Sequence, residues 1–269
     1  MYEVWCIVGK PRFKAICESV ITSERERSGI GTLGEKTLHA VLKQYFGPEG
    51  AARETRIGPF IADIVTDDCI IEIQTRAFNM LRRKLSAFLE KTPVMVVYPI
   101  PKTKWLLWID GETGGVSKKR KSPKQGAIYD AIPELYKIKP MLNHPNFRLC
   151  LALIDMEEYR YLNGWSDDRK KGSTRYDLVP VDMIEEIYIS NATDYIKFLP
   201  AGLNAQFTSK DYKNAAHTSL HISQTALNIL TSVGVVNRVG KLGHLYLYER
   251  ANPVSGVFAG LVNTAASRI

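Results

Sequence analysis

The sequence predicts an α/β fold over residues 1–190, followed by a smaller, mainly helical unit over residues 191–269. Two observations predict the first part: short β-branched segments alternate with helical periodicities between residues 33 and 98, and another apolar segment follows at 147–156. A third observation predicts the second part. Three short helical segments are followed there by two segments in which apolar and polar residues alternate, as in short strands, with two glycines between them.

The first part begins with a predicted strand over 4–8 and a helical segment after Pro11, and the polar, glycine-rich segment 23–35 is expected to be a linker. Leu38, Val41 and Leu42 recur at helical spacing, which predicts a helix that runs from residue 33 to residue 46 and ends at Gly47-Pro48. The remaining predicted elements are strands at 52–57, 60–65, 69–74, 94–98, 103–109 and 147–156, and helices at 78–91 and 129–138.

Composition and charge limit the classes of function. The net charge is +8, and residues 191–269 carry 7 Lys/Arg against 3 Asp/Glu, which favours a polyanionic partner. The sequence has no apolar run long enough to span a membrane and no secretory signal, so we expect a cytoplasmic protein without a membrane partner. The cysteines and histidines show no metal-ligand spacing, and neither a P-loop nor a dinucleotide-binding glycine pattern is present.

Asp63 and Glu72 interrupt two neighbouring predicted strands, which the turn-forming residues Thr66-Asp67-Asp68 join into a hairpin. Burying an ionised carboxylate in a β-branched strand is unfavourable unless the group is paired or binds a cation. Two such acids on adjacent strands therefore form a candidate divalent-metal site. The alternative is an edge hairpin in which both acids face solvent.

The element order α-β-β-β-α-β, with Glu35 in the first helix, Asp63 on the second strand and Glu72-x-Gln74 on the third, resembles the PD-(D/E)xK nuclease superfamily over residues 30–100. The resemblance implies a restriction endonuclease-like fold and Mg²⁺-dependent hydrolysis of phosphodiester bonds. It also implies that Asp63, Glu72 and Glu35 bind the metal and that Gln74 stands at the position of the family's lysine. For Glu35 taken alone, a favourable interaction with the helix dipole is the simpler explanation.

Gln74 departs from the family pattern, because a glutamine can orient a water molecule but cannot supply positive charge. The next predicted helix follows with Arg76, Arg82, Arg83 and Lys84. Lys84 is the candidate for the missing catalytic cation, although a solvated basic face is the more common role for such residues.

The segment 194–250 resembles a winged helix-turn-helix domain, with Thr208 as the predicted N-cap of the second helix and Ser223 as that of the third. The resemblance implies that the third helix enters the major groove of DNA and that the hairpin lies beside the phosphate backbone. Many winged helices bind proteins instead. The residues that the resemblance implies for DNA binding are Ser223, Gln224, Thr225 and Asn228 on the helix and Lys241 and His244 on the hairpin.

Together these patterns predict a Mg²⁺-dependent DNA endonuclease whose C-terminal unit recruits double-stranded DNA. Two alternatives remain open: a DNA-binding protein without catalysis, which Gln74 favours, and a protein-interaction module in which the basic charge is incidental. A homodimer would agree with the nuclease resemblance, since many nucleases of this fold cut both strands as dimers, but the sequence identifies no dimer surface.

Overall fold

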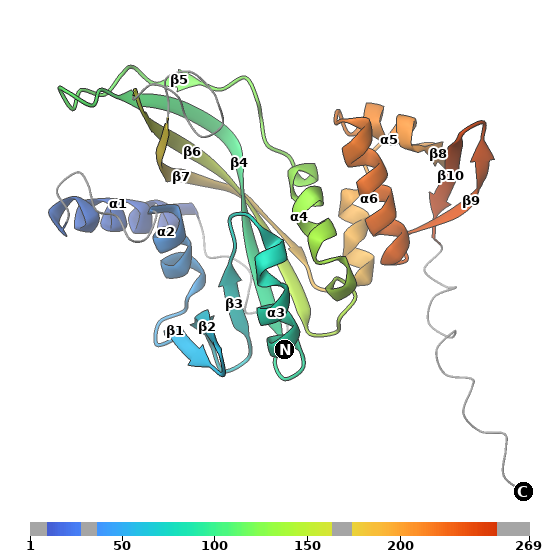
Figure 1. Cartoon of the computed structure of the whole chain (residues 1–269), viewed down its shortest axis with the longest axis horizontal. Helices are drawn as coiled ribbons and strands as arrows, with labels where there is room; N and C mark the ends of the chain where they lie inside the picture. Colours follow the sequence, from blue (N-terminus) through green and yellow to red (C-terminus); the bar gives the residue numbers. More distant parts are fainter. Residues whose placement is uncertain (1–9, 28–36, 163–173, 252–269) are drawn as a thin grey trace, which may run out of the picture.

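A mixed sheet of strand order β1-β2-β3-β4-β6-β7 forms the centre of the computed structural model, which describes residues 10–27, 37–162 and 174–251 (Figure 1). Strands β3, β4 and β6 run parallel, and the other neighbours run antiparallel. A short strand, β5 (Arg120–Lys121), pairs with β4. The six strands of the order are β1 (Ala52–Ile57), β2 (Phe60–Val65), β3 (Ile70–Ile73), β4 (Val94–Ile109), β6 (Phe147–Tyr161) and β7 (Thr174–Ile189).

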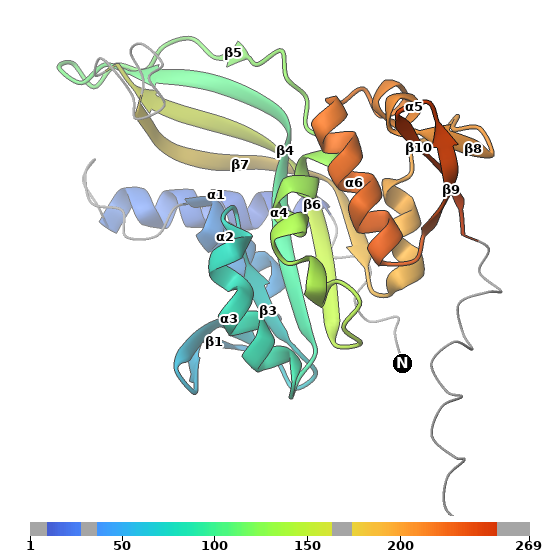
Figure 2. The same cartoon turned by 45° about the vertical axis from the view of Figure 1, so that its right-hand side comes forward.

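Helices cover both faces of this sheet, which confirms the α/β class (Figures 1 and 2). Helices α1 (Lys10–Arg27) and α2 (Thr37–Phe46) pack on Ile64, Ile71 and Ile73, whereas α3 (Phe78–Leu89) and α4 (Ile132–Lys137) pack on the opposite face against Val94 and Val96. Two 3₁₀ turns, η1 (Ile128–Ala131) and η2 (Lys139–Met141), flank α4. The parallel connections β3-α3-β4 and β4-α4-β6 therefore cross the same face of the sheet.

Strand β4 is one continuous strand, so the prediction of two separate strands on either side of Pro99 is wrong. The backbone of Val97 points toward β3, because its carbonyl oxygen accepts a hydrogen bond from Gln74 N. Pro99 and Pro101 lie two and four residues after Val97, so their backbone N atoms point to the same side of the strand. Strand β3 pairs with β4 only as far as Val97. The missing proline N–H groups therefore fall on an unpaired edge, where a strand tolerates proline.

One further prediction in the first part is wrong, and one strand was not predicted. Helix α1 continues to Arg27, so residues 23–27 belong to a helix and not to a linker, in keeping with the good helix propensity of Glu and Arg. Strand β7 was not predicted; it lies antiparallel to β6 along almost its whole length. The predicted strand at 4–8 and the start of the predicted helix at 33–36 lie outside the described residues.

Over residues 191–251, the C-terminal unit has three helical segments and a three-stranded sheet of order β8-β10-β9. The predicted N-cap Thr208 is confirmed, and it forms a capping box with Asp211. The predicted cap of the next helix is wrong, because Ser219 caps it and Ser223 lies one turn inside it, fully buried. The elements are η3 (Ala192–Phe198), β8 (Gln206–Thr208), α5 (Ser209–Ala215), α6 (Leu220–Ser232), β9 (Val236–Leu242) and β10 (Leu245–Arg250).

This unit shares one apolar core with the α3 and α4 face of the large sheet. Leu135 of α4 and Leu230 of α6 belong to the same buried cluster, and the rings of Tyr129 and Tyr212 meet edge to face at 6.0 Å. Both views show α6 alongside α4 (Figures 1 and 2). The unit therefore packs against the α3 and α4 side of the sheet, and its apolar core is continuous with the core there. Within the described residues, no helix combines the length and the apolar character needed to cross a membrane.

Candidate functional site

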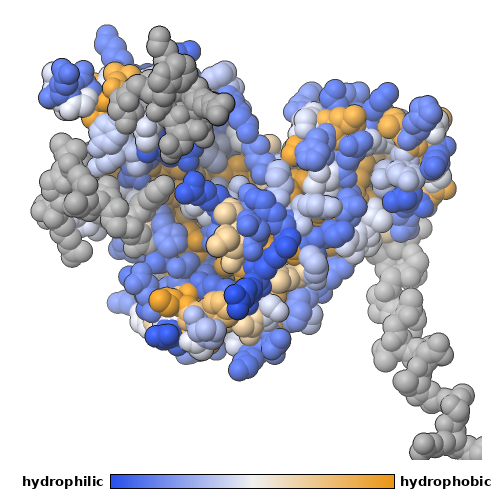
Figure 3. Space-filling view, in the orientation of Figure 1, coloured by the Kyte–Doolittle hydropathy of each residue, from blue (hydrophilic) through white to orange (hydrophobic). Residues whose placement is uncertain are grey.

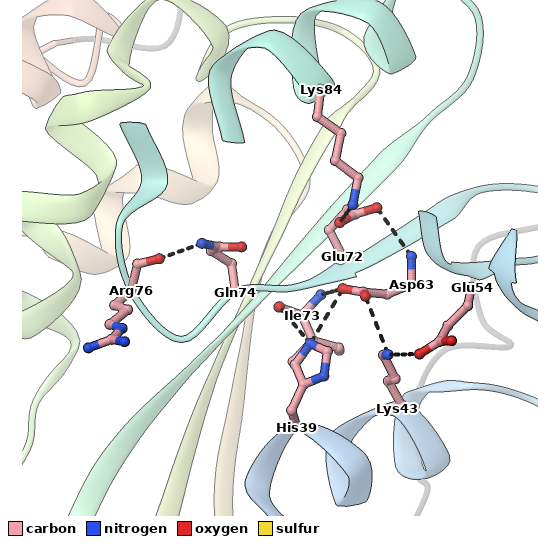
Figure 4. Close-up of polar contacts among 9 residues, drawn as sticks. All are labelled: His39, Lys43, Glu54, Asp63, Glu72, Ile73, Gln74, Arg76 and Lys84. Carbon is pink, nitrogen blue, oxygen red and sulfur yellow. Dashed lines mark hydrogen bonds and ion pairs between the residues drawn. The ribbon is translucent and has the colours of Figure 1, made fainter. Parts of the chain in front are cut away.

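Asp63 and Glu72 meet where β2 and β3 separate (Figure 4). The backbone ladder between these strands ends at Ile64, which lies opposite Ile71. Beyond that point side chains replace the ladder: Ile73 N donates to Asp63 Oδ2 at 2.9 Å, and Asp63 N donates to Glu72 Oε1 at 3.4 Å. The two carboxylates predicted on neighbouring strands therefore lie together in the opening between those strands.

Lys84 reaches the same opening from α3. Because β3 alternates, Ile71 and Ile73 face α2, and Glu72 faces α3. The Lys84 ammonium forms an ion pair with Glu72 Oε2, and the exposed fractions of the two side chains are 18% and 2%. The structure thus shows that Lys84 projects toward the hairpin, and the solvated basic face considered for it from the sequence is wrong.

Helix α2 contributes two side chains that the sequence analysis did not select. His39 Nε2 lies 3.6 Å from Asp63 Oδ2 and 3.2 Å from the Ile73 carbonyl oxygen. Lys43 Nζ lies 3.6 Å from Asp63 Oδ1 and 3.0 Å from Glu54 Oε1 on β1. The spacing of four residues places His39 and Lys43 on one side of the helix. A lysine within a run of apolar helical residues was the available signal, since such a charge needs a partner when buried.

The two carboxyl groups titrate in different ranges. Burial raises the pKa of Glu72 to about 7, although the adjacent Lys84 ammonium acts in the opposite direction. Burial alone would also raise the pKa of Asp63, but the hydrogen bonds from His39 and from the Ile73 N–H hold that pKa below its ordinary value. The site therefore combines one firmly ionised carboxylate with one that exchanges a proton near neutral pH.

Gln74 is not part of this arrangement. Gln74 turns away from the carboxylates, and its amide Nε2 donates to the Arg76 carbonyl oxygen (Figure 4). Glu35 lies outside the described residues. Gln74, which the sequence resemblance aligns with a lysine, is therefore separate from the acids; Lys84 is in contact with Glu72, and Lys43 is in contact with Asp63.

The donor atoms at the opening suit a hard divalent cation. Asp63 and Glu72 offer carboxylate oxygens, and the Ile73 carbonyl oxygen faces the same imidazole nitrogen as Asp63. No group of three or more His, Cys, Asp or Glu side chains that could hold a metal occurs among residues 10–27, 37–162 and 174–251. A cation here would keep several water or substrate oxygens in its shell, as Mg²⁺ commonly does.

The residues predicted to bind DNA in the C-terminal unit have different environments. Ser223 is buried, and its hydroxyl donates to the Ser219 carbonyl oxygen, so it cannot contact a ligand at the surface. The Thr225 hydroxyl donates to the carbonyl oxygen of His221, one turn earlier on α6. The exposed members of the set are Gln224, Asn228, Lys241 and His244. Hydrophilic residues cover much of this unit on the face shown in Figure 3.

The fold and the site define a class: a mixed α/β protein with two carboxylates and a lysine gathered at an opening between two strands of its sheet. Residues 36–190 match the family described as a domain of unknown function, DUF8091, and the chain belongs to that family. A protein of Treponema pallidum (strain Nichols) described as uncharacterized is 30% identical over 233 residues, which cover 83% of this chain and 88% of that protein. No solved structure matches the chain.

Proposed function

We propose that the protein is a Mg²⁺-dependent DNA endonuclease of the PD-(D/E)xK type, with Mn²⁺ as a substitute metal. The observation that carries this proposal is the meeting of Asp63, Glu72 and Lys84 at the opening between β2 and β3. The acids supply oxygen ligands for a hard cation, and the lysine supplies the positive charge that Gln74 lacks.

Each side chain has a chemical role in this proposal. When bound, Mg²⁺ would polarise the phosphate and favour hydroxide at neutral pH. Asp63 and Glu72 would hold the cation, and His39 and Lys43 orient the Asp63 carboxylate through the contacts given above. The Lys84 ammonium, held at the site by Glu72, would stabilise the negative charge that develops on the phosphate during cleavage.

Cleavage of supercoiled plasmid in Mg²⁺ tests the proposal, with EDTA as the blank. Asp63→Ala, Glu72→Ala and Lys84→Ala should each lower the rate at least about 100-fold, which is the usual effect of removing a metal ligand or a charge-stabilising group. Glu90→Ala is the matched control, because it removes an exposed carboxylate from the end of α3. Cutting that persists in both acid variants would refute the site.

A second candidate function is DNA binding without catalysis. Two observations favour it: Gln74 points away from the acids, and the described residues offer no third metal-binding side chain. This alternative predicts salt-dependent binding of duplex DNA with no cleavage in either Mg²⁺ or Mn²⁺. Cleavage that requires Asp63 and Glu72 would exclude it.

Cleavage of both strands by a homodimer would require two copies of the protein on one duplex. Sedimentation of the protein in complex with duplex DNA would show whether two copies bind together.

A further inference from the structure

The chain that returns from the tip of β4 carries a concentrated positive charge. Residues 116–124, which include β5 and are called the basic arm below, contain five Lys/Arg and no Asp/Glu. Two of the five form ion pairs, Lys119 with Glu157 and Lys124 with Asp130. The other three are exposed, and their side chains have no hydrogen-bond or ion-pair partner within the part of the chain that the structure describes. These three are Lys118, Arg120 and Lys121.

The basic arm is held on β4 in a defined position. Ser117 N donates to the Trp108 carbonyl oxygen at 2.8 Å. Lys119 Nζ lies 4.6 Å from the centre of the Trp105 ring and 2.6 Å from Glu157 Oε1. Like charges held this close together repel one another, and an anion that binds between them relieves the repulsion. Because the backbone is already ordered, a ligand would not have to order it on binding.

The sheet places the basic arm on the side of the molecule where the candidate site opens. Strand β6 occupies one edge of β4 from Val94 to Ile109, so β3 and β5 share the other edge. Strand β3 runs parallel to β4 and pairs with it at residues 94–97, and β5 pairs at residues 105–106. The arm therefore lies beyond the carboxyl end of β3, as both views show (Figures 1 and 2).

The distance from the opening to the arm can be bounded along β4. Val97 lies opposite Ile73, at the opening, and Lys121 lies opposite Trp105, eight residues farther along β4. At about 3.3 Å per residue this separation is at most about 26 Å, because the strand curves. One strand of duplex DNA advances about 3.4 Å per nucleotide, so the arm lies within about eight nucleotides of a phosphate at the opening.

We infer that the basic arm, through Lys118, Arg120 and Lys121, binds the phosphate backbone of duplex DNA on one side of the phosphate held at the Asp63 and Glu72 opening. The inference rests on the proposed DNA substrate and does not depend on cleavage. Charge complementarity supports it, because unpaired Lys and Arg side chains release counterions when they contact phosphates. Such contacts fix the position of the duplex without reading its sequence.

Fluorescence anisotropy of a labelled duplex, measured with the full chain in EDTA across a salt series, tests this inference. Lys121→Ala should lower the slope of log K against log salt by about 0.9 and weaken binding about eightfold at about 0.1 M salt. The double variant Arg120→Ala/Lys121→Ala should lower the slope by about 1.8. Lys121→Arg keeps the charge and should bind within about twofold of the wild type.

The matched control is Lys91→Ala, which removes an exposed lysine between α3 and β4, at the opposite end of β4 from the arm. Its salt slope should equal that of the wild type. An unchanged slope in Lys121→Ala would overturn the inference. So would a loss of equal size in Lys91→Ala or in Lys121→Arg, because the effect would then follow from total charge or from a disturbed fold.

Plasmid cleavage in Mg²⁺ by the same variants separates this inference from the proposed nuclease activity. Arm-dependent binding by a wild type that does not cut would support the inference and refute the nuclease. Cutting by the wild type, together with an unchanged salt slope in Lys121→Ala, would overturn the inference alone.

Discussion

The raised pKa of Glu72 predicts that the metal-free protein loses stability as the pH rises through neutrality. Burial raises the pKa of this carboxyl from 4.5 to about 7 in the folded protein. Between these values the folded state binds more protons than the unfolded state, so the free energy of unfolding falls as pH increases. The contribution of protonated Glu72 to the free energy of unfolding is fully present below pH 4.5 and is lost above about pH 7. At 1.36 kcal/mol per unit of pKa, the full loss is about 3 kcal/mol.

Urea unfolding in EDTA at several values between about pH 5 and pH 8 measures this loss against Glu72→Gln, a variant of nearly the same shape that cannot ionise. The wild type should lose about 2–3 kcal/mol relative to the variant from the lowest to the highest pH. The comparison isolates Glu72, because Asp63 and other groups titrate in both proteins. Lys84→Met should shift the loss of stability to higher pH, because the Lys84 ammonium lowers the pKa of Glu72.

The sign of the pH-dependent difference in stability between wild type and Glu72→Gln decides whether burial or the Lys84 ion pair dominates the pKa of Glu72. A constant difference between wild type and Glu72→Gln would mean that the two effects cancel. A wild type that gains stability relative to Glu72→Gln as pH rises would mean that Lys84 outweighs burial and lowers the pKa. Either result would refute the assignment of Glu72 as the carboxyl that exchanges a proton near neutrality.

Three further predictions follow from the site and the core. Because a metal ligand must be deprotonated, Mg²⁺ should raise Tm more at pH 8 than at pH 6, and an equal shift in wild type and Glu72→Gln would exclude Glu72 as a ligand. Leu230→Ala should lower the free energy of unfolding by about 2–5 kcal/mol in one transition seen by fluorescence and circular dichroism, and two transitions would show that the C-terminal unit unfolds separately. Gly126→Ala should lower Tm, because a Cβ there would lie 2.2 Å from the Pro101 carbonyl oxygen, whereas Gly111→Ala, with no atom within 4 Å, should not.

Much of the first part of the fold could be predicted from local patterns. The strands β1, β2 and β3 and the helix α3 were predicted near their observed bounds, because each carries its own periodicity or turn residues. Strand β7 escaped prediction: it mixes polar and apolar residues irregularly, and three register shifts against β6 break its alternation. Its conformation depends on pairing with β6, which no local pattern reports.

The C-terminal unit shows the same limit. The Thr208 cap was predictable, because a capping box involves residues three apart in the sequence. The docking of α6 was not, since the Lys139 to Asn228 contact joins residues 89 positions apart. A polar stripe on a helix looks the same in the sequence whether it faces solvent, DNA or a neighbouring helix.

The sequence by itself determined where the candidate site lies, and the tertiary structure decided what surrounds it. Asp63 and Glu72 could be recognised because an acid within a β-branched strand is unfavourable wherever that strand is buried. The sequence offered Lys84 only as a candidate and did not single out His39 or Lys43, because their contacts with the acids depend on how α3 and α2 cross the sheet. Periodicity reports which face of a helix is apolar, but only packing decides which partner a long polar side chain meets.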